Sequence, residues 1–256
     1  MSLAKTATRR RKASPAKKVS SAGVRVIDRA VDILECFDET HEKATLQELS
    51  DRTRIHKATA LRLLATLVNA GILDQPNASG TYELGFFALK CADTILAASD
   101  LRQRAAPIMR QLRDELDETI VLSVRNGNLI LNLDKFLSRQ GIIEAPTIGI
   151  YTALHDSSAG LAVLSTFSRK ELDAYMEACC AHMTAAETQA LRDSIAKIAT
   201  PAKTAIHNRT LAVPIVDGDG GAQAALSIQI PSGRIEPDLV ERCLKGLRRA
   251  ARKLSA

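Results

Sequence analysis

Apolar residues recur at steps of three and four in the first third of the chain, which is the period of an amphipathic α-helix. This period predicts a helix over residues 26–37. The sequence Thr45-Leu-Gln-Glu48 has the spacing of a capping box and predicts a short helix that ends near Thr53. A third helix is expected from Lys57 to Ala70, with Gly71 ending it. The residues expected to face the core from this helix are Leu61, Leu64, Leu67 and Val68.

Two short apolar runs follow the third helix. Ile72–Asp74 and Thr81–Leu84 enclose a segment rich in Pro, Asn and Gly, which predicts a small β-hairpin. The order helix, short helix, tight turn, helix and hairpin is that of a winged helix-turn-helix domain, expected over residues 23–85. Residues 86–99 are apolar at helical spacing and predict a linker helix, a candidate to pack on a partner chain.

Residues 100–256 combine helical and strand patterns and predict a second domain. A helix capped by Asp100 and containing Pro107 precedes a hairpin in which Asn126-Gly127 is the turn, with positive φ at both central positions. A second hairpin pairs 211–216 with 223–230. Further helices are predicted at 157–166, 168–178, 184–199 and 237–254, and further strands at 142–144 and 148–154. Because hairpins join antiparallel strands, the pattern predicts an α+β fold with a mainly antiparallel sheet.

Composition places the chain among soluble globular proteins, because 46% of its 256 residues are hydrophobic and 25% are charged. Residues 1–22 hold seven basic side chains and no acid, whereas the remainder holds 28 basic and 29 acidic ones. This segment lacks large apolar residues and is predicted to be a disordered basic tail. The chain has five scattered cysteines and no apolar run of signal-peptide or membrane-helix type, so a cytoplasmic protein with no membrane partner is expected.

The first domain divides sharply by charge. Residues 26–51 contain eight acids and two bases, whereas residues 52–73 contain Arg52, Arg54, Lys57 and Arg62 and no acid. Only the second stretch suits the phosphates of a nucleic acid. It includes the start of the third helix, where free N–H groups favour an anion. The alternative is a three-helix packing unit with a solvated basic face.

Three segments of the first domain resemble the IclR family of bacterial transcriptional regulators. They are RAVDILECF (29–37), LQELSDRTRIHKATALRLLATLVNAG (46–71) and YELG (82–85). The resemblance continues through residues 100–124, 154–164 and 209–228, and so covers about 24–254. It implies a winged helix-turn-helix on promoter DNA, a linker helix, and a C-terminal GAF-like α+β domain that binds a small-molecule effector. It also implies a homo-oligomer, either a dimer or a dimer of dimers, and no cofactor.

The resemblance places the family's recognition triplet Lys-Ser-Thr on Lys57, Ala58 and Thr59, with Arg62 at the next basic position. Because Ala58 lacks the serine hydroxyl, one hydrogen bond to DNA must come instead from His56 or Thr59. The residues predicted to bind DNA are Thr45, Arg54, His56, Lys57, Ala58, Thr59, Arg62 and Tyr82.

The resemblance also places the effector against the helix start after a Leu-His pair and against two late strands. The predicted effector-binding residues are Asp156, Ser157, Ser158, Ala159, Thr210, Ser227 and Gln229. Backbone N–H groups at a helix start and nearby hydroxyls suit a carboxylate or an aromatic acid. The chain departs from the family at Thr210, often a cysteine, and at 200–207, where the family has acids. Alternatively, these hydroxyls only cap a helix and satisfy strands.

Other functions are weighed on weaker patterns. Cys179-Cys-Ala-His182 has metal-capable side chains, but adjacent helical residues diverge by about 100° and no second cluster completes the ligands. His155-Asp156 precedes two serines without the nucleophile elbow of a hydrolase. No catalytic or metal site is therefore predicted. Two rival functions stay open: an enzyme whose first domain only dimerises, and an architectural DNA binder that relies on residues 1–22.

Overall fold

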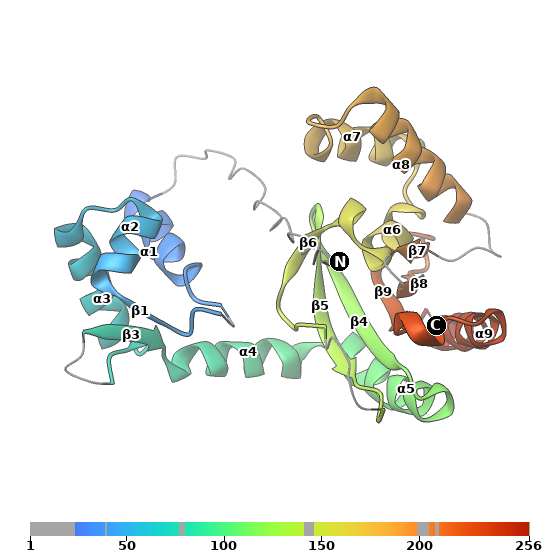
Figure 1. The fold of residues 1–256 in the computed structure, drawn as a ribbon, viewed down its shortest axis with the longest axis horizontal. Coiled ribbons are helices and arrows are strands. Elements are labelled where there is room, and N and C mark those ends of the chain that lie inside the picture. The colour runs from blue at the N-terminus through green and yellow to red at the C-terminus, as the bar shows by residue number, and fades with distance from the viewer. Residues whose placement is uncertain are drawn as a thin grey trace, which may run out of the picture. The chain divides into compact units, whose positions relative to one another are not determined.

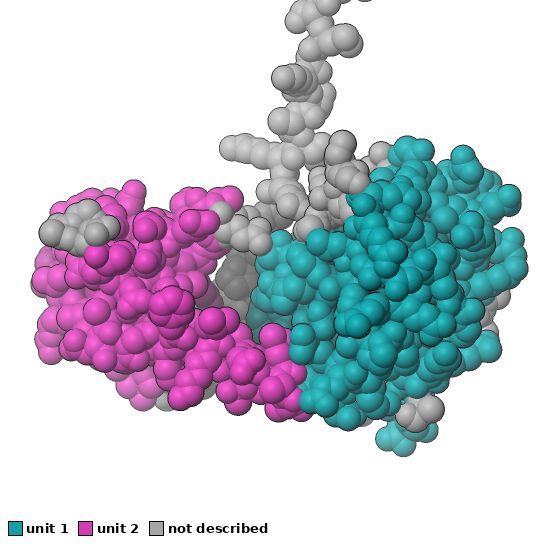
Figure 2. All heavy atoms as spheres, turned by 90° about the horizontal axis from the view of Figure 1, so that it is seen from below, with its two compact units in different colours: residues 1–16, 99–256 teal, residues 17–98 magenta. Residues whose placement is uncertain are grey.

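A computed structural model describes residues 24–38, 40–76, 80–140, 146–198, 205–207 and 210–255. These residues form two compact units that divide between Ala98 and Ser99 (Figure 2). We call residues 24–98 the head and residues 99–255 the C-terminal unit. The predicted basic tail, residues 1–22, lies outside the described residues.

The head has the predicted order of elements (Figure 1). Its helices are α1 (Arg25–Leu34), α2 (Leu46–Thr53), α3 (Lys57–Asn69) and α4 (Phe86–Ala98), and its strands are β1 (Lys43–Thr45), β2 (Leu73–Asp74) and β3 (Thr81–Leu84). The strands form one antiparallel sheet in the order β1-β3-β2. The predicted hairpin is therefore present, but β1 adds a strand that the sequence pattern missed, because three residues carry almost no period.

Local backbone signals decide where the helices of the head begin and end. Thr45 and Glu48 form the predicted capping box, in which Glu48 N donates to Thr45 Oγ1 at 3.2 Å and Thr45 N donates to Glu48 Oε2 at 2.7 Å. Gly71, at φ +69°, follows α3 as expected. A Cβ on Gly85 would lie 2.3 Å from the carbonyl oxygen of Gly71, so only glycine lets the hairpin leave so close to the end of α3.

The core of the head contains one departure from the sequence prediction. α3 buries Ala60, Leu63, Leu64 and Leu67, whereas Leu61 is 50% exposed. Leu61 lies about 110° around the helix from the centre of this buried face. The prediction that Leu61 faces the core was therefore wrong. Because apolar residues occupy most of the circumference of α3, spacing alone allows more than one inward stripe.

The C-terminal unit is an antiparallel sheet covered by helices on both faces, and it confirms the predicted α+β fold with a mainly antiparallel sheet. Its strands are β4 (Thr119–Asn126), β5 (Leu129–Phe136), β6 (Tyr151–Ala153), β7 (Ala205–His207), β8 (Thr210–Val216) and β9 (Ala222–Gln229). Their order is β6-β5-β4-β9-β8-β7. Its helices are α5 (Asp100–Leu116), α6 (Ser158–Leu164), α7 (Arg169–Cys179), α8 (Ala185–Ile198) and α9 (Pro237–Leu254), with single 3₁₀ turns at Leu154–Asp156 (η1) and Ser232–Arg234 (η2).

The helices divide between the two faces of this sheet. α6 packs on β8 and β9 from one face, while α5 and α9 lie together on the other (Figure 1). Tyr175 and Met176 of α7 and Ile195 of α8 join the hydrophobic cluster around α6. The polar groups described below lie on the face that α6 covers.

Several boundaries in the C-terminal unit differ from prediction. Ser99, rather than Asp100, caps α5, because Arg102 N donates to Ser99 Oγ at 3.3 Å. The β4–β5 turn is centred on Gly127 and Asn128, with positive φ only at Gly127. β7 is a strand that the sequence pattern did not predict. The strand expected at 148–154 is confined to Tyr151–Ala153, and that expected at 142–144 lies outside the described residues.

Candidate functional site

The turn between α2 and α3 is held by side chains that bond to the backbone. Ser50 Oγ donates to the carbonyl of Ile55 at 2.7 Å, and Thr53 Oγ1 donates to that of Leu49 at 2.6 Å. Arg54 ends α2 in the left-handed conformation at φ +57° and is exposed. The side chain of Ile55 is buried in the core of the head. The turn is therefore rigidly attached, and its cationic side chain points away from the core.

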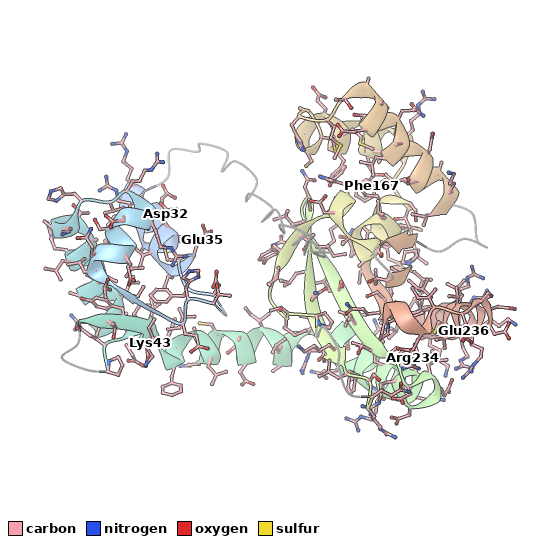
Figure 3. All side chains as sticks on the ribbon, in the orientation of Figure 1. Asp32, Glu35, Lys43, Phe167, Arg234 and Glu236 are labelled. Atoms are coloured by element: carbon pink, nitrogen blue, oxygen red, sulfur yellow. The ribbon has the colours of Figure 1, made fainter. Side chains whose placement is uncertain are left out.

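The first half of α3 is the exposed basic surface of the head. Lys57, Ala58 and Arg62 are exposed and Thr59 is half-buried. His56 caps the helix, because Ala58 N donates to His56 Nδ1 at 3.4 Å. The acids of the head lie elsewhere, for example Asp32 on α1 and Glu35 directly after it (Figure 3). An anion that approached the head would thus be attracted to the start of α3.

Two of the predicted DNA contacts have other roles in the structure. The Tyr82 ring is 6% exposed and packs in the core of the head, so this placement does not support Tyr82 as a DNA contact. Thr45 Oγ1 donates to Glu48 Oε2 at 2.9 Å while it caps α2. Tyr82 was predicted to bind DNA. Side chains alternate between the two faces of β3, and that of Tyr82 lies on the face toward the core.

The predicted effector residues of the α6 region are tied to the fold. Ser157 caps α6 by accepting from Gly160 N at 3.0 Å. Ser158 is 3% exposed, and its Oγ donates to the carbonyl of Thr210 on β8 at 2.9 Å. The side chain of Ala159 is buried, whereas that of Asp156 is exposed. Both serines therefore make the hydrogen bonds that the structural alternative expects: Ser157 caps a helix and Ser158 bonds to a strand.

The register of the sheet brings the other predicted effector residues together. Thr210 pairs with Gln229, and Ser227, 4% exposed, pairs with Ala212. Partners directly opposite each other share one face of an antiparallel pair. Because Ala212 belongs to the hydrophobic cluster around α6, Ser227 and its neighbours lie on the face that α6 covers. These three predicted residues and the start of α6 therefore lie on the same face of the sheet.

Sequence reasoning missed four polar residues of the same face. On β4, Thr119 is opposite Gln229, Val121 is opposite both Ser227 and Lys135, and Ser123 is opposite Asn132. Lys135 Nζ donates to the carbonyl of Pro146 at 2.8 Å, and Ser123 Oγ donates to Asn132 Oδ1 at 2.9 Å. The missed residues are Thr119, Ser123, Asn132 and Lys135. The signal that could have found the first two is their even spacing within the apolar run of β4.

A cluster of titratable side chains lies next to this site, around His155. Its Nδ1 is 2.6 Å from Tyr175 Oη and 3.7 Å from Cys180 Sγ, and burial lowers the pKa of His155. Burial raises the pKa of the Cys180 thiol to about 11, which leaves it protonated near neutral pH. Among the described residues, no group of three or more His, Cys, Asp or Glu side chains could hold a metal ion. The cluster thus offers neither a thiolate nucleophile nor a metal centre.

None of the helices in the described part of the chain combines the length and the apolar character needed to span a membrane.

Comparison with known proteins identifies both parts of the chain. The model of the family "Bacterial transcriptional regulator IclR C-terminal" matches residues 93–256, and that of the IclR helix-turn-helix domain matches residues 26–76. The HTH-type transcriptional regulator BhcR of Paracoccus denitrificans is 28% identical over 92% of this chain and 88% of its own. The transcriptional repressor IclR of Escherichia coli is 27% identical over 91% of this chain and 90% of its own.

Solved structures agree with this assignment. An IclR regulator from Alicyclobacillus acidocaldarius has a TM-score of 0.77 at 18% identity and covers 91% of this chain and 98% of its own, which shows the same fold. An IclR homologue from Microbacterium hydrocarbonoxydans, complexed with 4-hydroxybenzoate, has a TM-score of 0.72 at 25% identity over 90% of this chain and 97% of its own.

A helix-turn-helix head followed by an α+β ligand-binding unit defines a bacterial transcriptional regulator. The chain belongs to the IclR family of these regulators, which confirms the resemblance drawn from its motifs.

Proposed function

We propose that this regulator binds promoter DNA with the start of α3 in the major groove, and that a small anionic metabolite bound in the C-terminal unit alters this binding. The observation that carries the DNA-binding part is the exposed α3 surface. Lys57 and Arg62 lie there with Arg54 beside them, and no acid occurs between residues 52 and 73. Phosphate binding depends on such cations, and base recognition on side chains that reach the groove.

Each exposed residue has a role in this proposal. Lys57 and Arg62 bind guanine edges or phosphates, and Arg54 binds a phosphate next to the turn. His56 and Thr59 supply the hydrogen bond that Ala58 cannot make. Tyr82 stabilises the domain by packing in its core, and Thr45 stabilises it by capping α2.

We propose that two copies of the chain assemble through the head. None of the thirteen residues of α4 is buried, and Phe86, Leu89 and Ile95 are exposed. α1 also exposes Ile27 and Val31, one turn apart. Apolar helix faces of this extent are typical of contacts between chains, and a second copy supplies an identical face. A two-fold dimer would bind inverted half-sites about one helical turn of DNA apart, or a multiple of it.

We propose that the effector binds on the sheet face that α6 covers. Thr210, Ser227 and Gln229 would orient it, the backbone at Ser157–Ala159 would hold a carboxylate, and Asp156 would lie at the edge. Lys135 and Ser227 lie on either side of Val121, in one row of residues across β5, β4 and β9. This cation favours an anionic effector. The 4-hydroxybenzoate complex of the homologue supports a small aromatic acid as the chemical class.

We infer that this chain is not an enzyme and that it acts in the cytoplasm, where bacterial DNA lies. The related proteins are transcriptional regulators, and the protonated Cys180 and buried His155 offer no activated nucleophile. Turnover of any small molecule that binds the C-terminal unit would contradict this inference.

The test of DNA binding uses a fragment selected by the full-length protein from a randomised duplex pool. Lys57→Ala and Arg62→Ala should each weaken binding by about 5- to 100-fold and reduce the salt slope by about one phosphate contact. Lys170→Ala is the matched control, because Lys170 is an exposed cation of α7. A chain without residues 1–22 should keep its sequence preference. Binding that survives the α3 substitutions but is lost with residues 1–22 would favour the architectural binder.

The test of effector binding measures how a panel of small carboxylic acids changes the affinity for the selected DNA. Ser227→Ala and Lys135→Met should each abolish the response while they leave the DNA affinity without effector unchanged. An unaltered response in both variants would remove the effector site from this face of the sheet.

A further inference from the structure

The exposed Leu61 has no role in the proposals made so far. It is 50% exposed, and it is the one large apolar side chain among the thirteen residues of α3, all of them described, that is exposed to this degree. A single exposed leucine is common on protein surfaces. Its surroundings make this one informative.

The neighbours of Leu61 on the helix surface are small or cationic. Ala58 and Ala65 lie three residues before and four residues after it, where helix neighbours meet, and both are exposed. Lys57 lies one turn before it, and Arg62 follows it directly; both are also exposed. Leu61, Ala58 and Ala65 thus form an apolar strip on the surface of α3, in which Leu61 projects furthest. Lys57 and Arg62 lie beside this strip.

The charge of this surface indicates what covers the strip. Since residues 52–73 contain no acid, a polyanion fits the cations on both sides. Within duplex DNA, the apolar group that the major groove presents is the C5-methyl of thymine. We propose that Leu61 packs against a thymine methyl and thereby selects thymine at one position of each half-site.

This inference rests on the proposed entry of α3 into the major groove and adds the base that it recognises. Leu61 is one turn, or about 6 Å along the helix, from Lys57. Because stacked base pairs are about 3.4 Å apart, the thymine lies within about two base pairs of the base or phosphate that Lys57 binds. Ala58 contributes to the same effect, because its exposed methyl group lies beside Leu61.

The experiment replaces thymines of the selected duplex, one position at a time, with deoxyuridine, which lacks only the methyl group. At one position in each half-site, the substitution should weaken binding of the full-length protein about fourfold, the value of one buried methyl-sized group. Leu61→Ala should bind the thymine and deoxyuridine duplexes with equal affinity, which is the signature of a direct coupling in a double-mutant cycle. Leu61→Met should keep part of the preference.

Leu84→Ala is the matched control. Leu84 belongs to β3 of the same head and is also 50% exposed. This variant should keep the full fourfold sensitivity to deoxyuridine. Leu61→Ala should unfold in urea as the unsubstituted protein does, because the side chain it truncates makes little contact with the core.

The outcomes separate this inference from the proposed function. If deoxyuridine weakens Leu61→Ala as much as the unsubstituted protein at every thymine, or weakens neither, the methyl contact is overturned. In that case, reduced salt slopes in Lys57→Ala and Arg62→Ala would still support groove entry by α3. If those two variants bind DNA unchanged, groove entry itself is wrong and the methyl contact is overturned with it.

Discussion

The head and the C-terminal unit place their polar groups in opposite ways. In the C-terminal unit, five polar or charged residues are buried: Glu118, Thr119, Ser123, Ser158 and Ser227. Among residues 24–38, 40–76 and 80–98 of the head, no polar or charged residue is buried in this way. The basic residues of α3 instead face outward.

This difference fits the sizes of the two kinds of ligand in the proposed function. DNA is larger than the head, so the head can bind it only with surface charges, which salt screens. A small metabolite can be surrounded, so the C-terminal unit can use polar groups that are removed from water, where each hydrogen bond discriminates more strongly. The two kinds of group should respond differently to substitution, pH and salt.

The largest expected effect is the loss of the buried ion pair between Arg234 and Glu118. Arg234 Nη2 lies 2.9 Å from Glu118 Oε1, and Glu118 is 1% exposed. Arg234→Met would leave this carboxylate buried without its partner, which should lower the free energy of unfolding by about 3 kcal/mol in urea titrations at pH 7.5. Burial raises the pKa of Glu118, so its protonation favours the folded state and the loss should be smaller at pH 5.

The head supplies the contrasting pair. Lys43 Nζ lies 2.7 Å from Glu83 Oε2 at the surface, so Lys43→Met should leave the free energy of unfolding nearly unchanged. Equal losses in Arg234→Met and Lys43→Met would break the distinction between the two regions.

The next effect should be equal in both regions, because each contains a glycine against a carbonyl group. A Cβ added to Gly85 would lie 2.3 Å from the carbonyl oxygen of Gly71, and a Cβ added to Gly160 would lie 2.1 Å from that of Leu154. Gly85→Ala and Gly160→Ala should each lower the free energy of unfolding by about 2 kcal/mol. Gly218→Ala, where nothing lies within 4 Å, is the control. Unchanged stability in either variant would show that the backbone yields there.

A smaller effect, again alike in both regions, concerns the capping boxes. Thr45→Ala in α2 and Ser168→Ala in α7 should each lower the free energy of unfolding by about 1 kcal/mol. Hydrogen bonds from the capping residues hold the pKa values of Glu48 and Glu171 below their usual range. This contribution is therefore present above about pH 4.5 and is lost as the pH falls through the lowered pKa values. Urea titrations at pH 7 and pH 3.5 should show both variants closer to the unsubstituted protein at the lower pH.

The smallest expected effect is a pH dependence confined to the C-terminal unit. Burial lowers the pKa of His155, so the unfolded chain binds a proton more readily than the folded one. Stability should therefore be full above about pH 6.5 and should decline as the pH falls below it. His155→Gln should remove this part of the decline in urea titrations between pH 5.5 and 7.5. A decline of the same size in His155→Gln would assign it to another group.

The agreement between sequence and structure is best where the signal is local. The capping box at Thr45, the helix start at Ser168, the stop at Gly71 and the strand pairs of both hairpins of the C-terminal unit are where the pattern predicts them. Each depends on hydrogen bonds within a few residues, so a short stretch of sequence contains all the information that it needs.

The disagreements concern the direction of side chains and contacts between distant segments. Leu61 and Tyr82 have suitable spacing, yet the core of the head excludes the first and encloses the second. Lys135 joins the row of Ser227 because β5 and β9 pair on opposite sides of β4.

The sequence by itself determined the order of helices and hairpins, the concentration of cations at the start of α3, and membership of the IclR family. Only the tertiary structure decided that Leu61 faces outward, that Tyr82 faces inward, and that Lys135 shares a sheet face with Ser227. The physical reason is that periods and caps are properties of the neighbouring backbone, whereas the face that a side chain presents depends on which distant segments bury the most apolar surface together.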